Sequence, residues 1–202
     1  MKKTTVVILC VVLALLLAGA GLLYNNLKDE IQLGNLATQP PTEATPETVS
    51  ADDTQPTTEA PDYSAPDFTL LDWEGKERNL SEFEGKPVVL NFWASWCGPC
   101  KMEMPDFQKA YETYGEEIHF LMVNCTDGSR ETVETAKAFI EAEGYTFPVY
   151  FDTTSLGAYL YGASSIPLTY FIDEAGNLVT YGRGALTADI LQKGIDMIYT
   201  AE

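Results

Sequence analysis

Residues Val88–Cys100 read VVLNFWASWCGPC and lead an apolar run into two closely spaced cysteines. The run is rich in β-branched and aromatic side chains. It is too short and too apolar for an amphipathic surface helix, so it predicts a strand that is buried on both faces. Residues Lys101 to Tyr114 can form the next helix, and Pro105 inside it should kink the helix rather than end it.

The spacing of Cys97 and Cys100 points to thiol chemistry. In a C-x-x-C motif that opens a helix, both sulfurs lie near one turn. The first thiol then faces unsatisfied backbone N–H groups and the positive end of the helix dipole, which favour the thiolate. A thiol of this kind can attack disulfides.

A bare C-x-x-C motif also occurs in zinc sites and in c-type haem sites. Zinc would require a second ligand pair, but the chain offers a single histidine, His119, and two scattered cysteines, Cys10 and Cys125. Haem attachment would require a histidine directly after Cys100, where Lys101 stands. We therefore expect no metal and no cofactor.

Length and composition limit the number of domains and the kind of partner. A chain of 202 residues that is 46% hydrophobic can hold one core of ordinary size. Its net charge of −18 argues against nucleic acid and against an anionic membrane surface as partners, because both repel an acidic protein. We expect one folded domain.

The N-terminus carries a candidate membrane anchor. Lys2 and Lys3 precede an uncharged apolar run at residues 6–23, which has about the length that spans a bilayer. A cleaved signal peptide is the alternative, because residues 18–20, AGA, have the small-x-small form of a cleavage site. The apolar run continues past that site, so we expect residues 1–24 to be an uncleaved signal-anchor and the remainder to be extracytoplasmic.

Residues 25–64 are expected to form an acidic tether. From residue 37 onward this segment is mostly Pro, Thr, Glu, Asp, Ala and Gln, with almost no aliphatic side chains. It therefore lacks the apolar area that would offset the entropy of ordering it. The folded domain is then predicted at residues 65–202.

The folded segment alternates predicted strands and helices. A hairpin at residues 65–80 precedes the central strand, and a second interior strand is expected at residues 118–124. Helices are predicted at residues 129–143, 154–161 and 186–199, with a short strand at 147–151 and a hairpin at 169–181. This order implies a mixed sheet that is covered on both faces.

Three features together resemble the thioredoxin superfamily: NFWASWCGPCK at residues 91–101, Pro105, and SIPLT at residues 165–169. Within the superfamily they are most similar to the membrane-anchored TlpA/ResA-like thiol-disulfide oxidoreductases, from about residue 65 onward. The resemblance implies an α/β fold, a thioredoxin-like mixed sheet flanked by helices, with an N-terminal β-hairpin and a central insert.

The resemblance also implies roles for individual residues. Cys97 would be the nucleophile and Cys100 the resolving thiol of a redox-active disulfide. The Ile166–Pro167 bond would be cis and would leave the Ile166 backbone free to pair with a substrate strand. The expected substrate-binding residues are Trp96, Gly98, Pro99, Ile166 and Pro167. Gly-Pro between the cysteines is the pair of reducing thioredoxins, which favours a reductase.

Asn91 departs from thioredoxin, which has a buried aspartate at that place. In the TlpA/ResA-like branch a carboxylate after the next strand does similar work, and Asp127 occupies about that position. Asp127 is therefore a candidate catalytic acid/base, which we expect to be partly desolvated with a raised pKa. The alternative is a turn residue preceding Gly128. Cys125, likewise, is either a third redox thiol or a buried structural cysteine.

The predicted function is a membrane-tethered, extracytoplasmic protein-disulfide reductase. It would act on protein disulfide clients such as apocytochrome c and draw electrons from a membrane-borne donor. One alternative is a peroxiredoxin-like thiol peroxidase, which is weakened by Ala94 at the place of an expected threonine. Another is a non-catalytic metal-binding module, for which the nearby Met102 and Met104 would point to different helix faces.

Overall fold

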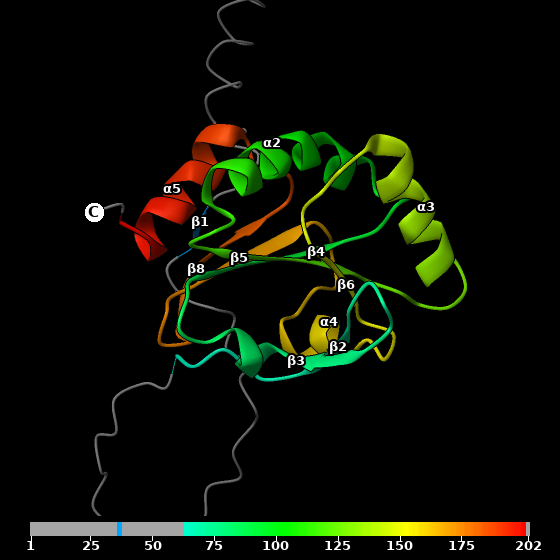
Figure 1. The fold of residues 1–202 in the computed structure, drawn as a ribbon, viewed down its shortest axis with the longest axis horizontal. Coiled ribbons are helices and arrows are strands. Elements are labelled where there is room, and N and C mark those ends of the chain that lie inside the picture. Colours follow the sequence, from blue (N-terminus) through cyan, green and yellow to red (C-terminus); the bar gives the residue numbers. More distant parts are fainter. Residues whose placement is uncertain (1–35, 38–62, 201–202) are drawn as a thin grey trace, which may run out of the picture. The chain divides into compact units, whose positions relative to one another are not determined.

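The computed structural model describes residues 36–37 and 63–200 (Figure 1). Within these ranges, no helix has both the length and the apolar character needed to cross a bilayer. The predicted anchor at residues 1–24 and most of the predicted tether lie outside the described residues.

The described chain contains a mixed sheet and the helices that pack on it. The strands are β1 (Leu36–Ala37), β2 (Thr69–Leu71), β3 (Glu77–Asn79), β4 (Val88–Trp93), β5 (His119–Asn124), β6 (Val149–Phe151), β7 (Leu168–Ile172) and β8 (Leu178–Arg183). The helices are the 3-10 helix η1 (Leu80–Phe83), α2 (Gly98–Tyr114), α3 (Val133–Glu143), α4 (Leu156–Leu160) and α5 (Ala188–Ile198).

Strand β4 occupies the middle of the sheet, whose order is β1-β8-β7-β4-β5-β6-β2-β3. It runs parallel to β5 and antiparallel to β7, while β2 and β3 form the N-terminal hairpin that joins the sheet through β6. This is the thioredoxin-like mixed sheet predicted from the sequence. All six residues of β4 are buried, as expected for a strand covered on both faces.

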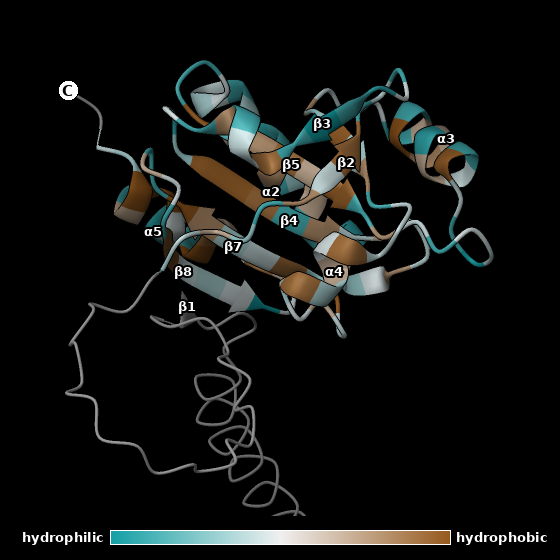
Figure 2. Cartoon of the chain, turned by 90° about the horizontal axis from the view of Figure 1, so that it is seen from below, coloured by the Kyte–Doolittle hydropathy of each residue, from teal (hydrophilic) through white to brown (hydrophobic). Residues whose placement is uncertain are grey.

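The two faces of β4 contact different helices, because successive side chains of a strand point to opposite sides. Val89 and Trp93 belong to the core cluster that contains α2, α3 and α5, whereas Val88, Leu90 and Phe92 belong to the cluster with η1. Figure 1 shows α2, α3 and α5 on one side of the central strands and α4 on the other. Figure 2 shows hydrophobic residues along the central strands and mixed hydropathy on the covering helices. Because side chains alternate along β4, Asn91 lies on the same face as Val89 and Trp93 and points toward α2.

All four predicted helices begin at different residues in the structure, α4 and α5 by two residues and α2 and α3 by three or four. Helix α2 begins at Gly98, with Cys97 as its N-cap, so the motif itself forms its first turn, and the helix continues through Pro105 as predicted. Helix α3 begins at Val133 rather than residue 129, because Thr132 caps it and residues 127–131 form a turn.

Strand β1 is an element that the sequence did not predict. Leu36 and Ala37 fall in the segment predicted as an unstructured tether, yet they pair antiparallel with Gly182 and Tyr181 of β8 at the edge of the sheet. Within the segment predicted as a tether, these two residues thus pair with the sheet.

Candidate active site

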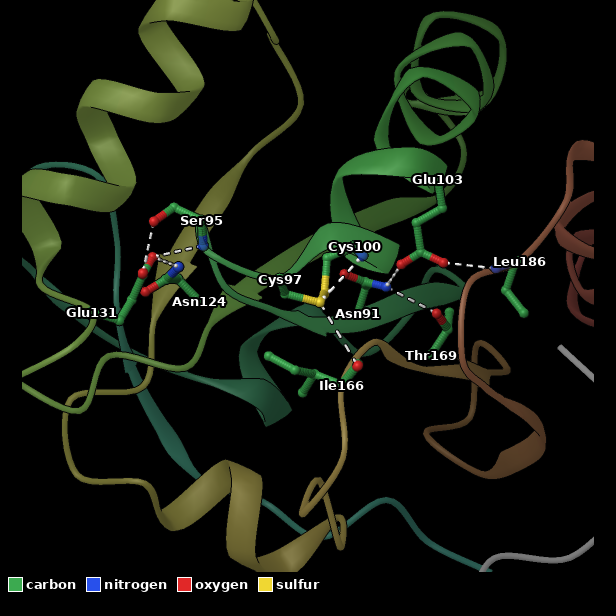
Figure 3. The surroundings of a disulfide bond; sticks show 10 residues. All are labelled: Asn91, Ser95, Cys97, Cys100, Glu103, Asn124, Glu131, Ile166, Thr169 and Leu186. Atoms are coloured by element: carbon green, nitrogen blue, oxygen red, sulfur yellow. Dashed lines mark hydrogen bonds between the residues drawn. A yellow bond between two sulfur atoms is a disulfide. The ribbon is translucent and has the colours of Figure 1, made fainter. Parts of the chain in front are cut away.

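A disulfide joins Cys97 and Cys100 at the point where β4 passes into α2 (Figure 3). Cys97 caps the helix, and the backbone N–H of Cys100 donates to Cys97 Sγ at 3.2 Å. Cys97 is 4% exposed and Cys100 is fully buried. A helix N-terminus favours negative charge, so in the reduced state this position stabilises a thiolate on Cys97.

The loop before β7 lies against the disulfide. Its Ile166–Pro167 peptide bond is cis, as the resemblance predicted. The carbonyl oxygen of Ile166 is 3.7 Å from Cys97 Sγ. Strand β7 pairs with β4, with Leu168 opposite Phe92, and this pairing carries the proline loop to the sulfurs at the end of β4.

The predicted substrate-binding residues come from two parts of the chain, the cysteine motif and the loop with the buried Pro167. Trp96 is 41% exposed, Gly98 and Pro99 are exposed, and Ile166 is half-buried. Trp93, by contrast, is fully buried in the core on the α2 side of the sheet. Of the two cysteines, only Cys97 retains some exposure, 4% against 0% for Cys100.

Glu103 is a buried carboxyl group that the sequence analysis missed. It lies on α2 three residues after Cys100 and is 1% exposed. Asn91 Nδ2 donates to Glu103 Oε1 at 2.9 Å, and the Leu186 backbone N–H donates to Oε2 at 2.8 Å. Asn91 Nδ2 also donates to Thr169 Oγ1 on β7 at 2.9 Å. Figure 3 shows this network beside the disulfide.

Burial controls the ionisation of Glu103. Desolvation raises its pKa to about 8, although the hydrogen bonds from Leu186 and Asn91 act in the opposite direction. The group is therefore mostly protonated at pH 7 in the oxidised protein. A carboxyl group that titrates near neutral pH is suited to exchange protons with a thiol.

The helical spacing of α2 could have revealed Glu103. Its buried residues are Cys100, Glu103, Met104 and Phe107, which is the i, i+3, i+4, i+7 pattern of a helix face turned to the core. A glutamate within such a face needs a polar partner. Because Asn91 is the buried polar residue of β4, the two residues form a pair that sequence reasoning can propose.

The environment predicted for Asp127 is wrong. The side chain is exposed, and its pKa is lowered, chiefly by the backbone N–H groups of Glu131 and Ser129. Asp127 Oδ1 accepts from Ser129 N at 2.7 Å and from Glu131 N at 3.0 Å. Asp127 thus organises the turn after β5, the alternative that the Asp-Gly sequence allowed.

Cys125 has the properties of a structural cysteine. Burial, followed by the nearby Asp152 and Glu131 carboxylates, raises the pKa of its thiol to about 12. A thiol with so high a pKa forms little of the reactive thiolate at neutral pH. Its backbone N–H donates to Trp93 O at 2.8 Å, so Cys125 continues the pairing of β5 with β4.

Comparison with known proteins agrees with the fold and with thiol-disulfide chemistry. The AhpC/TSA family model matches residues 61–181. The chain belongs to the AhpC/TSA family. The thiol-disulfide oxidoreductase ResA of Geobacillus thermodenitrificans is 34% identical over 146 residues, which cover 72% of this chain and 82% of that protein. With the disulfide-bonded pair at Cys97 and Cys100, this makes the protein a thiol-disulfide oxidoreductase.

Solved structures share the same architecture. StoA from Bacillus subtilis is 28% identical with a TM-score of 0.56, covering 66% of this chain and 98% of that chain. The pneumococcal exposed lipoprotein thioredoxin Etrx1 of Streptococcus pneumoniae is 31% identical with a TM-score of 0.56, covering 65% of this chain and 98% of that chain. The shared region corresponds to the domain that holds the disulfide.

Glu103 should make the stability of the oxidised protein depend on pH. Its pKa is raised on folding from 4.5 to about 8, so the unfolded chain loses this proton at lower pH than the folded protein does. The corresponding stability is complete below pH 4.5 and is lost as the pH rises through 8. We expect the parent to lose about 2–4 kcal/mol more than Glu103→Gln between pH 4.5 and pH 9.

Urea denaturation of both oxidised proteins across that pH range measures the difference. Comparison with the glutamine variant cancels the contributions of all other titrating groups. Parallel stability curves for the two proteins would show that folding does not raise the pKa of Glu103.

Proposed function

We propose that this thiol-disulfide oxidoreductase is a membrane-tethered, extracytoplasmic reductase of protein disulfides. One observation carries the proposal. Cys97 caps α2 and is slightly exposed, while Glu103 is buried on the same face of α2 as Cys100. Gly98 and Pro99 between the cysteines support the reducing direction, because the same pair occurs in reducing thioredoxins.

The first step is attack by the Cys97 thiolate on one sulfur of a client disulfide. A bond forms between Cys97 Sγ and that sulfur, the client disulfide breaks, and the other client sulfur leaves as a thiolate. The N-terminus of α2 stabilises the attacking thiolate. The cis-proline loop, whose Ile166 carbonyl is 3.7 Å from Cys97 Sγ, offers backbone groups to an extended client segment.

The second step resolves the mixed disulfide. In the fraction of molecules whose Glu103 is ionised, the Cys100 thiol transfers its proton to the Glu103 carboxylate, and the resulting thiolate attacks Cys97 Sγ. The bond between Cys97 and the client breaks, and the client sulfur that Cys97 had attacked leaves as a thiolate. The Cys97–Cys100 disulfide forms in the same step. Glu103, now protonated, returns its proton to the leaving thiolate or to solvent. Two electrons pass to the client, and a membrane-borne thiol donor restores them.

The membrane attachment rests on residues outside the described structure. Residues 1–24 would form an uncleaved anchor, residues 25–64 a tether, and residues 65–202 the thioredoxin-like domain. The lysine-flanked apolar run at residues 6–23 supports the anchor. The description of Etrx1 as an exposed lipoprotein supports an extracytoplasmic location for the related domain.

Reduction of a protein disulfide tests the proposed activity. The reduced protein should accelerate the reduction of insulin by dithiothreitol and should not consume hydrogen peroxide faster than free cysteine does. Cys100→Ser should accumulate a mixed disulfide with insulin on a non-reducing gel, whereas Cys97→Ser should accumulate none. Peroxide turnover without insulin reduction would identify a peroxidase, and trapping by Cys97→Ser alone would reverse the roles of the two cysteines.

The pH dependence of thiol alkylation tests which carboxylate serves Cys100. The negative charge of ionised Glu103 disfavours a thiolate on Cys100 and so raises the pKa of that thiol. Glu103→Gln should therefore move the midpoint of Cys100 alkylation to lower pH by about one unit. Asp127→Asn is the matched control, and it should leave the midpoint unchanged because Asp127 is exposed. A shift in Asp127→Asn and none in Glu103→Gln would favour Asp127 instead.

The anchor is tested by the state of the N-terminus in cells. Mass spectrometry of the membrane fraction should find a chain that retains residues 1–24, because the apolar run passes through its candidate cleavage site. A soluble product that begins at Gly21 would show that the segment is a cleaved signal peptide.

A further inference from the structure

A second buried carboxyl group ties the turn after β5 to the loop that carries the cysteines. Glu131 is fully buried. Its Oε1 accepts from the Ser95 backbone N–H at 2.9 Å and from Asn124 Nδ2 at 2.7 Å, and its Oε2 accepts from Ser95 Oγ at 2.7 Å (Figure 3). Ser95 lies two residues before Cys97, so the turn at residues 127–131 has a fixed position beside the active-site loop.

That turn places a guanidinium group on the residue next to the nucleophile. The Cζ atom of Arg130 lies 3.6 Å from the centroid of the Trp96 ring. Trp96 is 41% exposed and directly precedes Cys97, and Arg130 is exposed as well. The stacked pair therefore forms part of the surface that a client contacts when its disulfide reaches Cys97.

The N–H groups of Arg130 are available to a ligand. The ion pairs found in the described ranges are Arg78–Glu82 and Lys109–Asp106, and Arg130 takes part in neither. Asp127 of the same turn accepts the backbone N–H groups of Ser129 and Glu131 with its Oδ1, and the charge of Arg130 helps to lower its pKa, although the two side chains form no ion pair. A guanidinium that stacks by its face on an indole still presents its N–H edge, which matches a carboxylate.

We propose that Arg130, stacked on Trp96, binds an aspartate or glutamate of the protein client close to the client cysteine that Cys97 attacks. This inference rests on the proposed reductase function and adds a sequence preference to it. The net charge of the chain, −18, repels an acidic client as a whole, so the preference concerns one carboxylate beside the client disulfide rather than a generally acidic partner.

Single-turnover oxidation of the reduced protein by synthetic peptides tests the proposal. Three peptides share one intramolecular disulfide and differ in having glutamate, glutamine or lysine beside the attacked cysteine. Acid quenching and mass spectrometry give the second-order rate constant for each peptide. For the parent we expect the glutamate peptide to react about threefold to tenfold faster than the glutamine peptide, and the lysine peptide to react slowest.

Arg130→Gln should reduce the glutamate-to-glutamine ratio to about one while the glutamine peptide keeps its rate. Arg130→Lys should retain only part of the ratio, because an ammonium group keeps the charge but not the stacked, forked geometry. Lys109→Gln is the matched control, since it removes an exposed cation elsewhere on the domain and should leave the ratio unchanged. The parent's ratio should also fall toward one as KCl is raised to about 1 M.

The outcomes separate this proposal from the proposed function. If the parent reduces the glutamate and glutamine peptides at equal rates, the carboxylate preference is overturned while the reductase function stands. If Arg130→Gln slows all three peptides by the same factor, Arg130 acts through the reactivity of Cys97 and does not bind the client, which also overturns the proposal. If the parent reduces none of the peptides, the reductase function fails, and this inference fails with it.

Discussion

The buried carboxyl group of Glu103 holds together three segments that secondary structure alone does not connect. It belongs to the second turn of α2, accepts a hydrogen bond from Asn91 in the central strand, and accepts another from the backbone N–H of Leu186 before α5. Burying a carboxyl group is costly unless it is hydrogen-bonded or neutral. Here both conditions are met, because its two oxygens have donors and its pKa is raised to about 8. The Glu103 carboxyl group therefore connects α2 to its neighbours and can also exchange a proton near neutral pH.

Glu131 is a second buried carboxyl group that connects separate segments, here the turn after β5 and the loop before Cys97. Two of its hydrogen bonds join the turn after β5 to Ser95, and the third comes from Asn124 of β5. The two carboxyl groups differ in consequence. Glu103 shares the buried face of α2 with Cys100, while Glu131 directly follows Arg130, whose guanidinium lies 3.6 Å from the centroid of the Trp96 ring. As proposed above, Glu103 would serve proton transfer inside the site and Arg130 would serve the choice of client at its rim.

Much of the fold follows from the sequence because it depends on local patterns. The buried run of β4, the hairpin turn at residues 173–177 and the helix opened by the cysteines were all predicted, and the structure contains each of them. The resemblance to the TlpA/ResA-like proteins added the cis bond before Pro167, which sequence patterns alone do not indicate. Strand β1 was missed because two residues carry too little pattern to predict a strand.

The errors at the site have a common cause. Asp127 was chosen because it follows a core strand, but its neighbours are backbone N–H groups of its own turn, and such contacts depend on loop conformation that a sequence does not show. Glu131 and Arg130 were overlooked for the same reason. Glu103 was within reach, since helical spacing from Cys100 places it on the buried face of α2. It was missed because the helical residues were counted from Lys101, so Glu103 was not compared with Cys100 for a shared buried face.

The ionisation of Glu103 can be observed directly by a ¹³C NMR titration of its side-chain carboxyl carbon in the oxidised full-length protein. Glu103→Gln provides the assignment, because the resonance of this carbon should be missing from its spectrum. A neutral, buried group behind the disulfide should titrate with a pKa of about 8. A midpoint at or below 4.5, the ordinary value for a glutamate, would contradict the role given to Glu103 in resolving the mixed disulfide.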